Sequence, residues 1–154
     1  MSAKQAALAR KNLEKRLAPL RTAPIIAPPR GWTKALREAL GMTTRQLAAR
    51  MGAAPSRIPA IEKAEVTGAV TVRTLREAAA AMGCTFEYAF VPARPIDAIL
   101  EDQARRKAGE ELSRLDHSMR LENQALTKSD LEDERRRMID DWLSGARRGL
   151  WDGG

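Results

Sequence analysis

The sequence predicts a mainly α-helical protein that also contains one β-strand and a C-terminal helical extension. Three observations lead to this class. Apolar residues recur at helical spacing over most of the 154 residues. Glycines and prolines divide the first half into short segments. Only residues 84–91 alternate large apolar side chains with smaller or polar ones at the period of a strand.

The N-terminal segment, residues 1–30, is expected to hold one helix and an extended connector. Leucines among Lys and Arg recur at helical spacing over residues 3–20. Pro24, Pro28 and Pro29 then follow, and proline cannot continue a helix.

Residues 31–83 are predicted to form a domain of four short helices. The first shows an apolar stripe that consists of Trp32, Leu36 and Leu40. The second begins with a capping box, in which Thr43 and Gln46 bond to each other's backbone amides. The third begins near Pro55, and Thr71 caps the fourth.

Two of these helices, with the turn between them, carry the most specific pattern in the chain. Gln-Leu-Ala at residues 46–48, then Gly52, then Ile-x-x-Ile-Glu at residues 58–62 form this pattern. Residues 32–83 thereby resemble the XRE-type, lambda-repressor-like helix-turn-helix domain of phage repressors and antitoxins. That resemblance implies a transcriptional regulator that binds operator DNA as a dimer. The alternative is a packing of four helices without a role on DNA.

A recognition helix of this kind presents its N-terminal residues to base edges, and the preceding helix meets a phosphate. The residues expected at the DNA are Thr43, Thr44, Arg45, Ser56, Arg57, Ala60 and Lys63. Arg57 is the predicted base reader, because a guanidinium can bond guanine with two hydrogen bonds. Two residues depart from the family pattern. Ala54 replaces a polar cap, and Pro59 lies inside the expected recognition helix, where it removes a hydrogen bond.

Residues 84–94 are expected to contain the strand and to mediate dimerisation. Phe86, Tyr88 and Phe90 would share one face of it. A lone strand leaves its backbone groups unpaired, so it needs a partner. That partner is either the same strand of a second copy, which gives a homodimer, or the connector of its own chain.

Residues 95–154 are predicted to be helical and to bind a partner protein. A broken apolar stripe extends to about Gln124. A second capping box, Ser129 with Glu132, is expected to begin the last helix, which Gly145 ends.

The net charge of +7 is unevenly distributed. Residues 1–94 carry 16 Lys and Arg against 6 Asp and Glu, a net charge of +10, whereas residues 95–154 carry 11 against 14, a net charge of −3. This asymmetry indicates a basic half that binds a polyanion and a tail with another task. A merely solubilising surface is the alternative.

The composition also bounds function and location. No stretch approaches the roughly 18 apolar residues of a membrane span. His117 and Cys84 are the only histidine and cysteine, so no catalytic triad, Cys-His pair or zinc site can be assembled. We therefore expect a cytoplasmic, non-enzymatic protein without metal or cofactor.

The order of these segments resembles that of the mobile mystery protein A family. That family is associated with mobile mystery protein B, a Fic-domain protein, in what resembles a toxin–antitoxin pair. Fic proteins transfer a nucleotide moiety, and many are inhibited by a helix with the pattern (Ser/Thr)-x-x-x-Glu-(Gly/Asn). Ser118, Glu122 and Asn123 match it within SMRLEN.

The resemblance implies that Glu122 pairs with a toxin arginine that otherwise binds the γ-phosphate, while Ser118 bonds the phosphate-binding loop. The i, i+4 spacing places Ser118 and Glu122 on one side of a helix. Three alternatives remain: a solvated helix surface, a toxin with its own inhibitory helix, or a stand-alone regulator whose C-terminal helices serve only oligomerisation.

Overall fold

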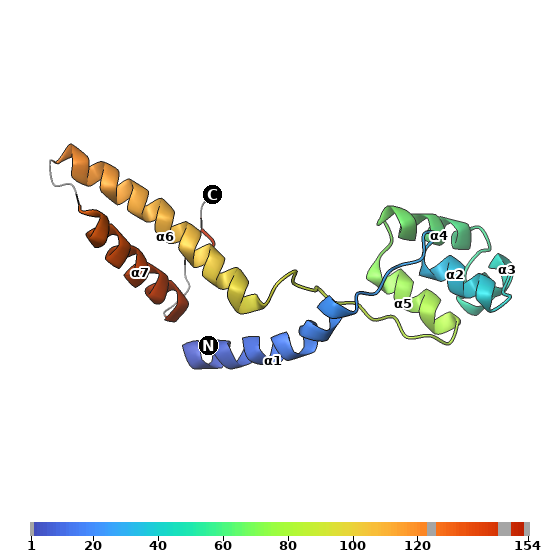
Figure 1. Ribbon diagram of the computed structural model, residues 1–154. Coiled ribbons are helices and arrows are strands. Elements are labelled where there is room, and N and C mark those ends of the chain that lie inside the picture. Colours follow the sequence, from blue (N-terminus) through green and yellow to red (C-terminus); the bar gives the residue numbers. More distant parts are fainter. Residues whose placement is uncertain (1, 123–125, 145–148, 153–154) are drawn as a thin grey trace. The chain divides into compact units, whose positions relative to one another are not determined.

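The computed structural model describes residues 2–122, 126–144 and 149–152, and the predicted mainly helical class is confirmed (Figure 1). The helices are α1 (Ala3–Thr22), α2 (Trp32–Ala39), α3 (Thr44–Arg50), α4 (Arg57–Thr67), α5 (Val72–Ala81), α6 (Ile96–Leu121) and α7 (Lys128–Ser144). They form two compact units. One comprises residues 1–23 and 91–154, and the other comprises residues 24–90. Within the described residues, no helix is long and apolar enough to cross a membrane.

The unit of residues 24–90 is built from α2 to α5 around one apolar core (Figure 1). The buried residues of this core are Leu47, Ala48, Ile58, Ile61 and Met82. Ala48 is fully buried, and its small side chain allows α3 and α4 to approach closely. The four short helices expected over residues 31–83 are therefore confirmed.

The predicted apolar stripe of α2 is confirmed at Leu36, which packs against the core, but not at its two ends. Trp32 is 42% exposed and Leu40 lies beyond the helix, 52% exposed, whereas Thr33 and Arg37 are buried. The reason is electrostatic. Acidic side chains of α4 lie opposite α2 and bind the Arg37 guanidinium and the first backbone amides of the helix. These polar contacts determine which side of α2 faces inward.

The predicted strand at residues 84–94 is wrong. No β-strand occurs in the described parts of the chain, and residues 84–92 form coil. A strand persists only when a neighbour takes up its backbone amides and carbonyls, and no described segment does so. The side chains make local contacts instead: the rings of Phe86 and Tyr88 stack with centroids 6.2 Å apart, and Arg76 lies 5.7 Å from the Tyr88 centroid.

The other unit is a hairpin of α6 and α7, which lie side by side, with α1 against the start of α6. Leu100, Ala104 and Leu150 form its buried core, and Trp142 of α7 packs on them. Alanine at the contact lets the two helices approach closely. Glu14 of α1 accepts a hydrogen bond from the backbone amide of Ile96, 3.1 Å away, and so caps α6.

The capping box of α7 lies two residues before the predicted one. The Asp130 amide donates to the Thr127 hydroxyl at 3.2 Å, and the Thr127 amide donates to the Asp130 carboxylate at 3.1 Å. These hydrogen bonds, first that of the Thr127 hydroxyl, hold the pKa of Asp130 below its usual value. Ser129 lies inside the helix and so cannot cap it. The chain offers the same local pattern twice, and the earlier copy is used.

Candidate nucleic-acid interface

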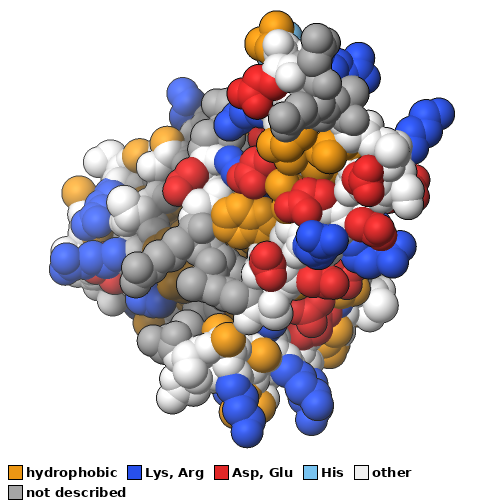
Figure 2. Space-filling model, turned by 90° about the vertical axis from the view of Figure 1, so that its left-hand side faces the viewer, with side chains coloured by type: hydrophobic (Ala, Val, Ile, Leu, Met, Phe, Trp, Pro, Cys, Tyr) orange, Lys and Arg blue, Asp and Glu red, His pale blue; other side chains and the backbone are white. Residues whose placement is uncertain are grey.

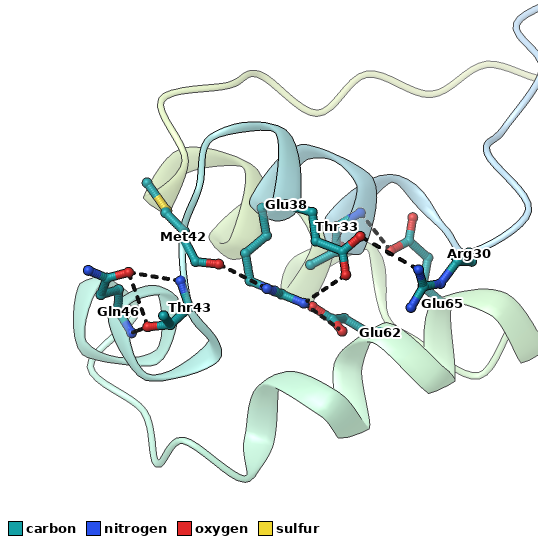
Figure 3. A network of polar contacts seen from close by, with 9 residues as sticks. Arg30, Thr33, Glu38, Met42, Thr43, Gln46, Glu62 and Glu65 are labelled. Carbon is teal, nitrogen blue, oxygen red and sulfur yellow. Dashed lines mark hydrogen bonds and ion pairs between the residues drawn. The ribbon is translucent and has the colours of Figure 1, made fainter.

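Helices α3 and α4, joined by residues 51–56, form the two-helix element that the sequence predicts. The expected box at the start of α3 is confirmed (Figure 3). The backbone N–H of Gln46 donates to the Thr43 hydroxyl at 3.2 Å, and the backbone N–H of Thr43 donates to the side-chain Oε1 of Gln46 at 2.8 Å. This reciprocal pair fixes where α3 begins.

Helix α4 has one buried and one solvent-facing side. Ile58, Ile61 and Glu62 are buried. The exposed residues include the four that were predicted to contact DNA from this region, which are Ser56, Arg57, Ala60 and Lys63. Burial thus separates the residues that hold α4 from those that are free to meet a ligand.

Pro59 does not disturb α4. The helix begins at Arg57, so Pro59 is its third residue. The first four amides of a helix have no partner within it, and a proline there removes no helical hydrogen bond. The loss of a hydrogen bond that was expected from its position in the sequence therefore does not occur.

Arg57 is held loosely. Its guanidinium Nη2 lies 3.9 Å from Glu77 Oε2 of α5, and its side chain is 51% exposed. Glu77 also accepts a hydrogen bond from Arg73 Nε at 3.1 Å. Exposed ion pairs of this kind contribute about 0–1 kcal/mol, so Arg57 can exchange Glu77 for another acceptor. The sequence gives no sign of the Arg57–Glu77 contact, because the two residues are 20 positions apart and on different helices.

The predicted residues at the start of α3 are also near the surface. Thr43 and Arg45 are exposed and Thr44 is partly buried. The Thr43 hydroxyl is occupied by the capping box. Among the described residues, neither Arg45 nor Lys63 has an ion-pair partner, so both cations are available to an anionic ligand.

A buried ion pair fixes α4 against α2 (Figure 3). Arg37 Nε donates to Glu62 Oε1 at 2.6 Å, and Arg37 Nη1 donates to the Met42 carbonyl at 2.9 Å. The hydrogen bond to Glu62 is the main cause that raises the pKa of Arg37 above its usual value. The pair therefore sets the orientation of the helix that carries Arg57.

Glu65 makes the second polar link between α4 and α2. Its carboxylate accepts the backbone amides of Trp32 at 2.7 Å and Thr33 at 3.0 Å, and so caps the N-terminus of α2. Gly31 adjoins this contact with φ of +81°. A Cβ on Gly31 would lie 3.0 Å from the Glu65 carboxylate. The close approach of Glu65 thus requires glycine at this position.

The other predicted site residues lie outside this element. Ser118 is in α6, and Glu122 caps the C-terminus of that helix, with its amide donating to the Ser118 carbonyl at 3.3 Å. Both side chains are exposed. Asn123 lies outside the described residues. Tyr88 and Phe90, expected at a dimer contact, are 61% and 90% exposed.

The helix-turn-helix family model HTH_3 matches residues 34–88. No curated protein and no solved structure matches the chain. The matched range contains α3, α4 and every residue predicted to contact DNA. The chain thus contains an XRE-type helix-turn-helix domain, which is a DNA-binding domain generally without enzymatic activity. In the described part of the chain, no group of three or more His, Cys, Asp or Glu side chains could hold a metal ion.

Proposed function

We propose that the protein is a transcriptional regulator that binds double-stranded operator DNA, with α4 in the major groove. The observation that carries this proposal is the division of α4 into a buried and an exposed side. Ser56, Arg57, Ala60 and Lys63 are exposed, while Ile58, Ile61 and the Glu62 ion pair hold the opposite side. A recognition helix needs this arrangement, because base edges are read only by side chains that point away from the core.

Each exposed residue has a role in the proposal. Arg57 leaves Glu77 and donates two hydrogen bonds to a guanine, since the guanidinium fork matches O6 and N7. Arg45 and Lys63, which have no partner among the described residues, bind phosphates and set the register of the domain on the duplex. Ala60 contacts a base without a hydrogen bond, as a thymine methyl permits.

The test compares Arg57→Ala with wild type on the upstream promoter fragment and on a shuffled duplex of equal length. The variant should lose about 1–3 kcal/mol on the promoter and less on shuffled DNA. Arg73→Ala is the matched control, because Arg73 also pairs with Glu77 but lies on α5. Equal losses on both duplexes would make Arg57 a phosphate contact. If the wild type showed no salt-sensitive retention on either duplex, the proposal of DNA binding would be wrong.

A more specific role is proposed for the end of α6. Resemblance to mobile mystery protein A suggests an antitoxin that represses its own operon and inhibits a Fic-domain toxin. The exposure of Ser118 and Glu122, one helical turn apart, supports this role. Glu122 would bind an arginine of the toxin's nucleotide site, because a carboxylate competes with phosphate for a guanidinium. The alternative is a stand-alone regulator whose C-terminal helices serve only oligomerisation.

Coexpression with a Fic-domain protein encoded beside this gene tests the antitoxin role. Glu122→Gln should restore nucleotide transfer by the toxin, whereas Glu132→Gln, an exposed acidic residue of α7 without an ion pair among the described residues, should leave it suppressed. Full suppression with Glu122→Gln would contradict the role. A neighbouring frame without a Fic motif would favour the stand-alone regulator.

We include a homodimer in the proposal, because operators with two half-sites require two copies of the domain. The exposed rings of Tyr88 and Phe90 support a contact through residues 84–90, without any requirement for a strand. Light scattering at micromolar concentration should give the mass of two chains for wild type and of one for a Tyr88→Ser, Phe90→Ser variant. A single-chain mass for wild type would exclude the dimer.

A further inference from the structure

Helix α1 belongs to the most basic stretch of the chain, although it lies outside the helix-turn-helix domain. Residues 1–23 hold 6 Lys and Arg against 1 Glu, a net charge of +5. Residues 24–90 hold 9 Lys and Arg against 5 Asp and Glu, a net charge of +4, although this segment is almost three times as long. The function proposed for residues 24–90 does not explain why α1 carries so much charge.

One side of α1 is occupied by contacts with α6. Arg10 Nε donates to the Asp97 carboxylate at 3.0 Å, and Glu14 caps α6 through the amide of Ile96. Arg21 pairs with Glu14 on this same side. The hydrogen bond from Arg21, followed by that from Ile96, holds the pKa of Glu14 below its usual value. These contacts occupy the side of α1 that carries Arg10, Glu14 and Arg21, and much of the remaining helix surface is exposed.

The solvent side of α1 carries a row of lysines. Lys4, Lys11 and Lys15 are all exposed, and within the described residues none of them has an ion-pair partner. Their spacing of seven and four residues places them within about 40° of one another around the helix axis. At about 1.5 Å per residue, the row is about 16 Å long. We call these three residues the lysine row.

We propose that the lysine row binds the phosphate backbone of the duplex that residues 24–90 read. This inference rests on the proposed function and adds a second, sequence-independent contact to it. Three aligned cations, none of them in an ion pair among the described residues, are complementary to a duplex that carries a negative charge about every 1.7 Å of its axis. Lysine suits this task, because its ammonium is a point charge that meets phosphate without a fixed geometry.

The covalent connection keeps this contact within reach of the same site. Nine residues, 23–31, separate α1 from α2. Fully extended, they span at most about 30 Å, which is less than one turn of B-DNA, about 34–36 Å. Lys15 lies about 10 Å of helix before Thr22 and Lys4 about 27 Å. The row can therefore reach phosphates within about two helical turns of the site that α4 occupies, and the tether raises the effective concentration for each further phosphate contact.

An anionic membrane surface is the competing partner for a basic helix. Such helices combine cations with a broad apolar face that enters the lipid. Leu8 and Leu13, 60% and 49% exposed, are the exposed leucines of α1. They lie about 140° apart around the helix axis, so they do not form one such face. The charge pattern therefore favours DNA over a bilayer.

The test measures the salt dependence of DNA binding by the full chain. A Lys4→Gln, Lys11→Gln, Lys15→Gln variant keeps good helix formers at all three positions. The control is Lys128→Gln, Arg135→Gln, Arg136→Gln, which removes the same charge from exposed positions of α7 that have no ion-pair partner among the described residues. Circular dichroism verifies that both variants keep the helix content of wild type.

Three neutralised contacts should reduce the slope of log K against log salt by about 2.7, on promoter and shuffled duplex alike. The loss of affinity between 50 and 200 mM salt would then be about 40-fold smaller than for wild type. The control should change the slope by less than about 1. An unchanged slope, or equal changes in both variants, would overturn the inference.

Two further outcomes distinguish a failed DNA contact from a failure of the proposed function. If wild type binds neither duplex, the proposed DNA-binding function is wrong, and the inference that rests on it is wrong as well. If the lysine variant keeps the wild-type slope but loses binding to vesicles of phosphatidylserine and phosphatidylcholine, the row binds membranes and the DNA contact is wrong. A reduced slope together with unchanged promoter preference supports the inference, because phosphate contacts carry no sequence information.

Discussion

At the residue scale, the pair of Arg37 and Glu62 shows how buried charge organises the domain. The two side chains are 10% and 9% exposed and 2.6 Å apart, and the Met42 carbonyl takes up a further guanidinium N–H. A buried ion pair gives modest net stability, because both charges lose their hydration. Its value is orientation: it fixes which sides of α2 and α4 meet, and therefore which side of α4 is left for DNA.

We predict that Glu62→Gln lowers the free energy of unfolding by up to about 3–5 kcal/mol, because it leaves the buried Arg37 with only the half-exposed Glu38, 3.7 Å away, as a counter-charge. The double variant Arg37→Met, Glu62→Leu should recover most of this loss, since neither charge then remains. Urea unfolding followed by circular dichroism measures both. A Glu62→Gln loss below about 1 kcal/mol would show that water reaches Arg37 and would contradict the prediction.

At the element scale, the helix boundaries depend on caps that reach across short and long distances. Thr43 and Gln46 form their box within three residues. Glu65, in contrast, reaches across 33 positions to cap α2. Gly31 makes the second arrangement possible, because its φ of +81° and ψ of 159° lie in a region that is essentially limited to glycine.

Gly31→Ala should cost about 2–4 kcal/mol of unfolding free energy. The backbone strain contributes about 1–3 kcal/mol, and displacement of Glu65 weakens the cap of α2, which typically contributes about 1 kcal/mol. Gly41→Ala is the control. Gly41 also has a positive φ, +65°, but a Cβ there meets nothing within 4 Å, so about 1–2 kcal/mol is expected. Chemical denaturation measures the free energy of unfolding of both variants. Equal losses of unfolding free energy would exclude a role for the Glu65 contact.

The same comparison of local and distant contacts explains what the sequence could predict. The Thr43 box follows from residues three apart. The inward side of α2 could not be predicted, because Arg37 turns inward toward Glu62, 25 positions away. The alternation at residues 84–91 was misleading, since periodicity says nothing about whether a pairing partner exists. The α7 box was misplaced because Thr127 and Ser129 both begin a suitable pattern.

The candidate DNA-contact residues were assigned for a different reason, and their role on DNA stays a prediction. Its residues follow from their spacing within a helix-turn-helix, and exposure of Arg57 and Lys63 is consistent with that spacing. Glu77, which holds Arg57 in the free protein, could not be predicted. The roles of Ser118 and Glu122 depend on a partner protein, so neither the sequence nor the fold of this chain alone tests them.

At the scale of the whole molecule, the two units divide the charge differently from the two halves of the sequence. The linear sequence suggests a basic part, residues 1–94, and an acidic part, residues 95–154. Residues 1–23 and 91–154 together hold 18 Lys and Arg against 15 Asp and Glu, a net charge of +3, because α1 joins the acidic hairpin. Figure 2 likewise shows acidic and basic side chains interspersed on the face that it presents.

This division predicts that a fragment of residues 24–90 folds alone. Its apolar core, the Arg37–Glu62 pair and the Glu65 cap all lie within it, and domains of about 55–65 residues do fold alone. Circular dichroism should show cooperative thermal unfolding of the fragment. A non-cooperative melt would mean that residues outside 24–90 complete the core.

The fragment also tests how the units share DNA binding. It should keep the promoter preference of the full chain, because α4 and its supports are present. Without α1 it should show a salt slope shallower by about 2.7, if the lysine row accounts for three phosphate contacts. A slope equal to that of the full chain would place all phosphate contacts in residues 24–90, and would leave the basic side of α1 for another partner.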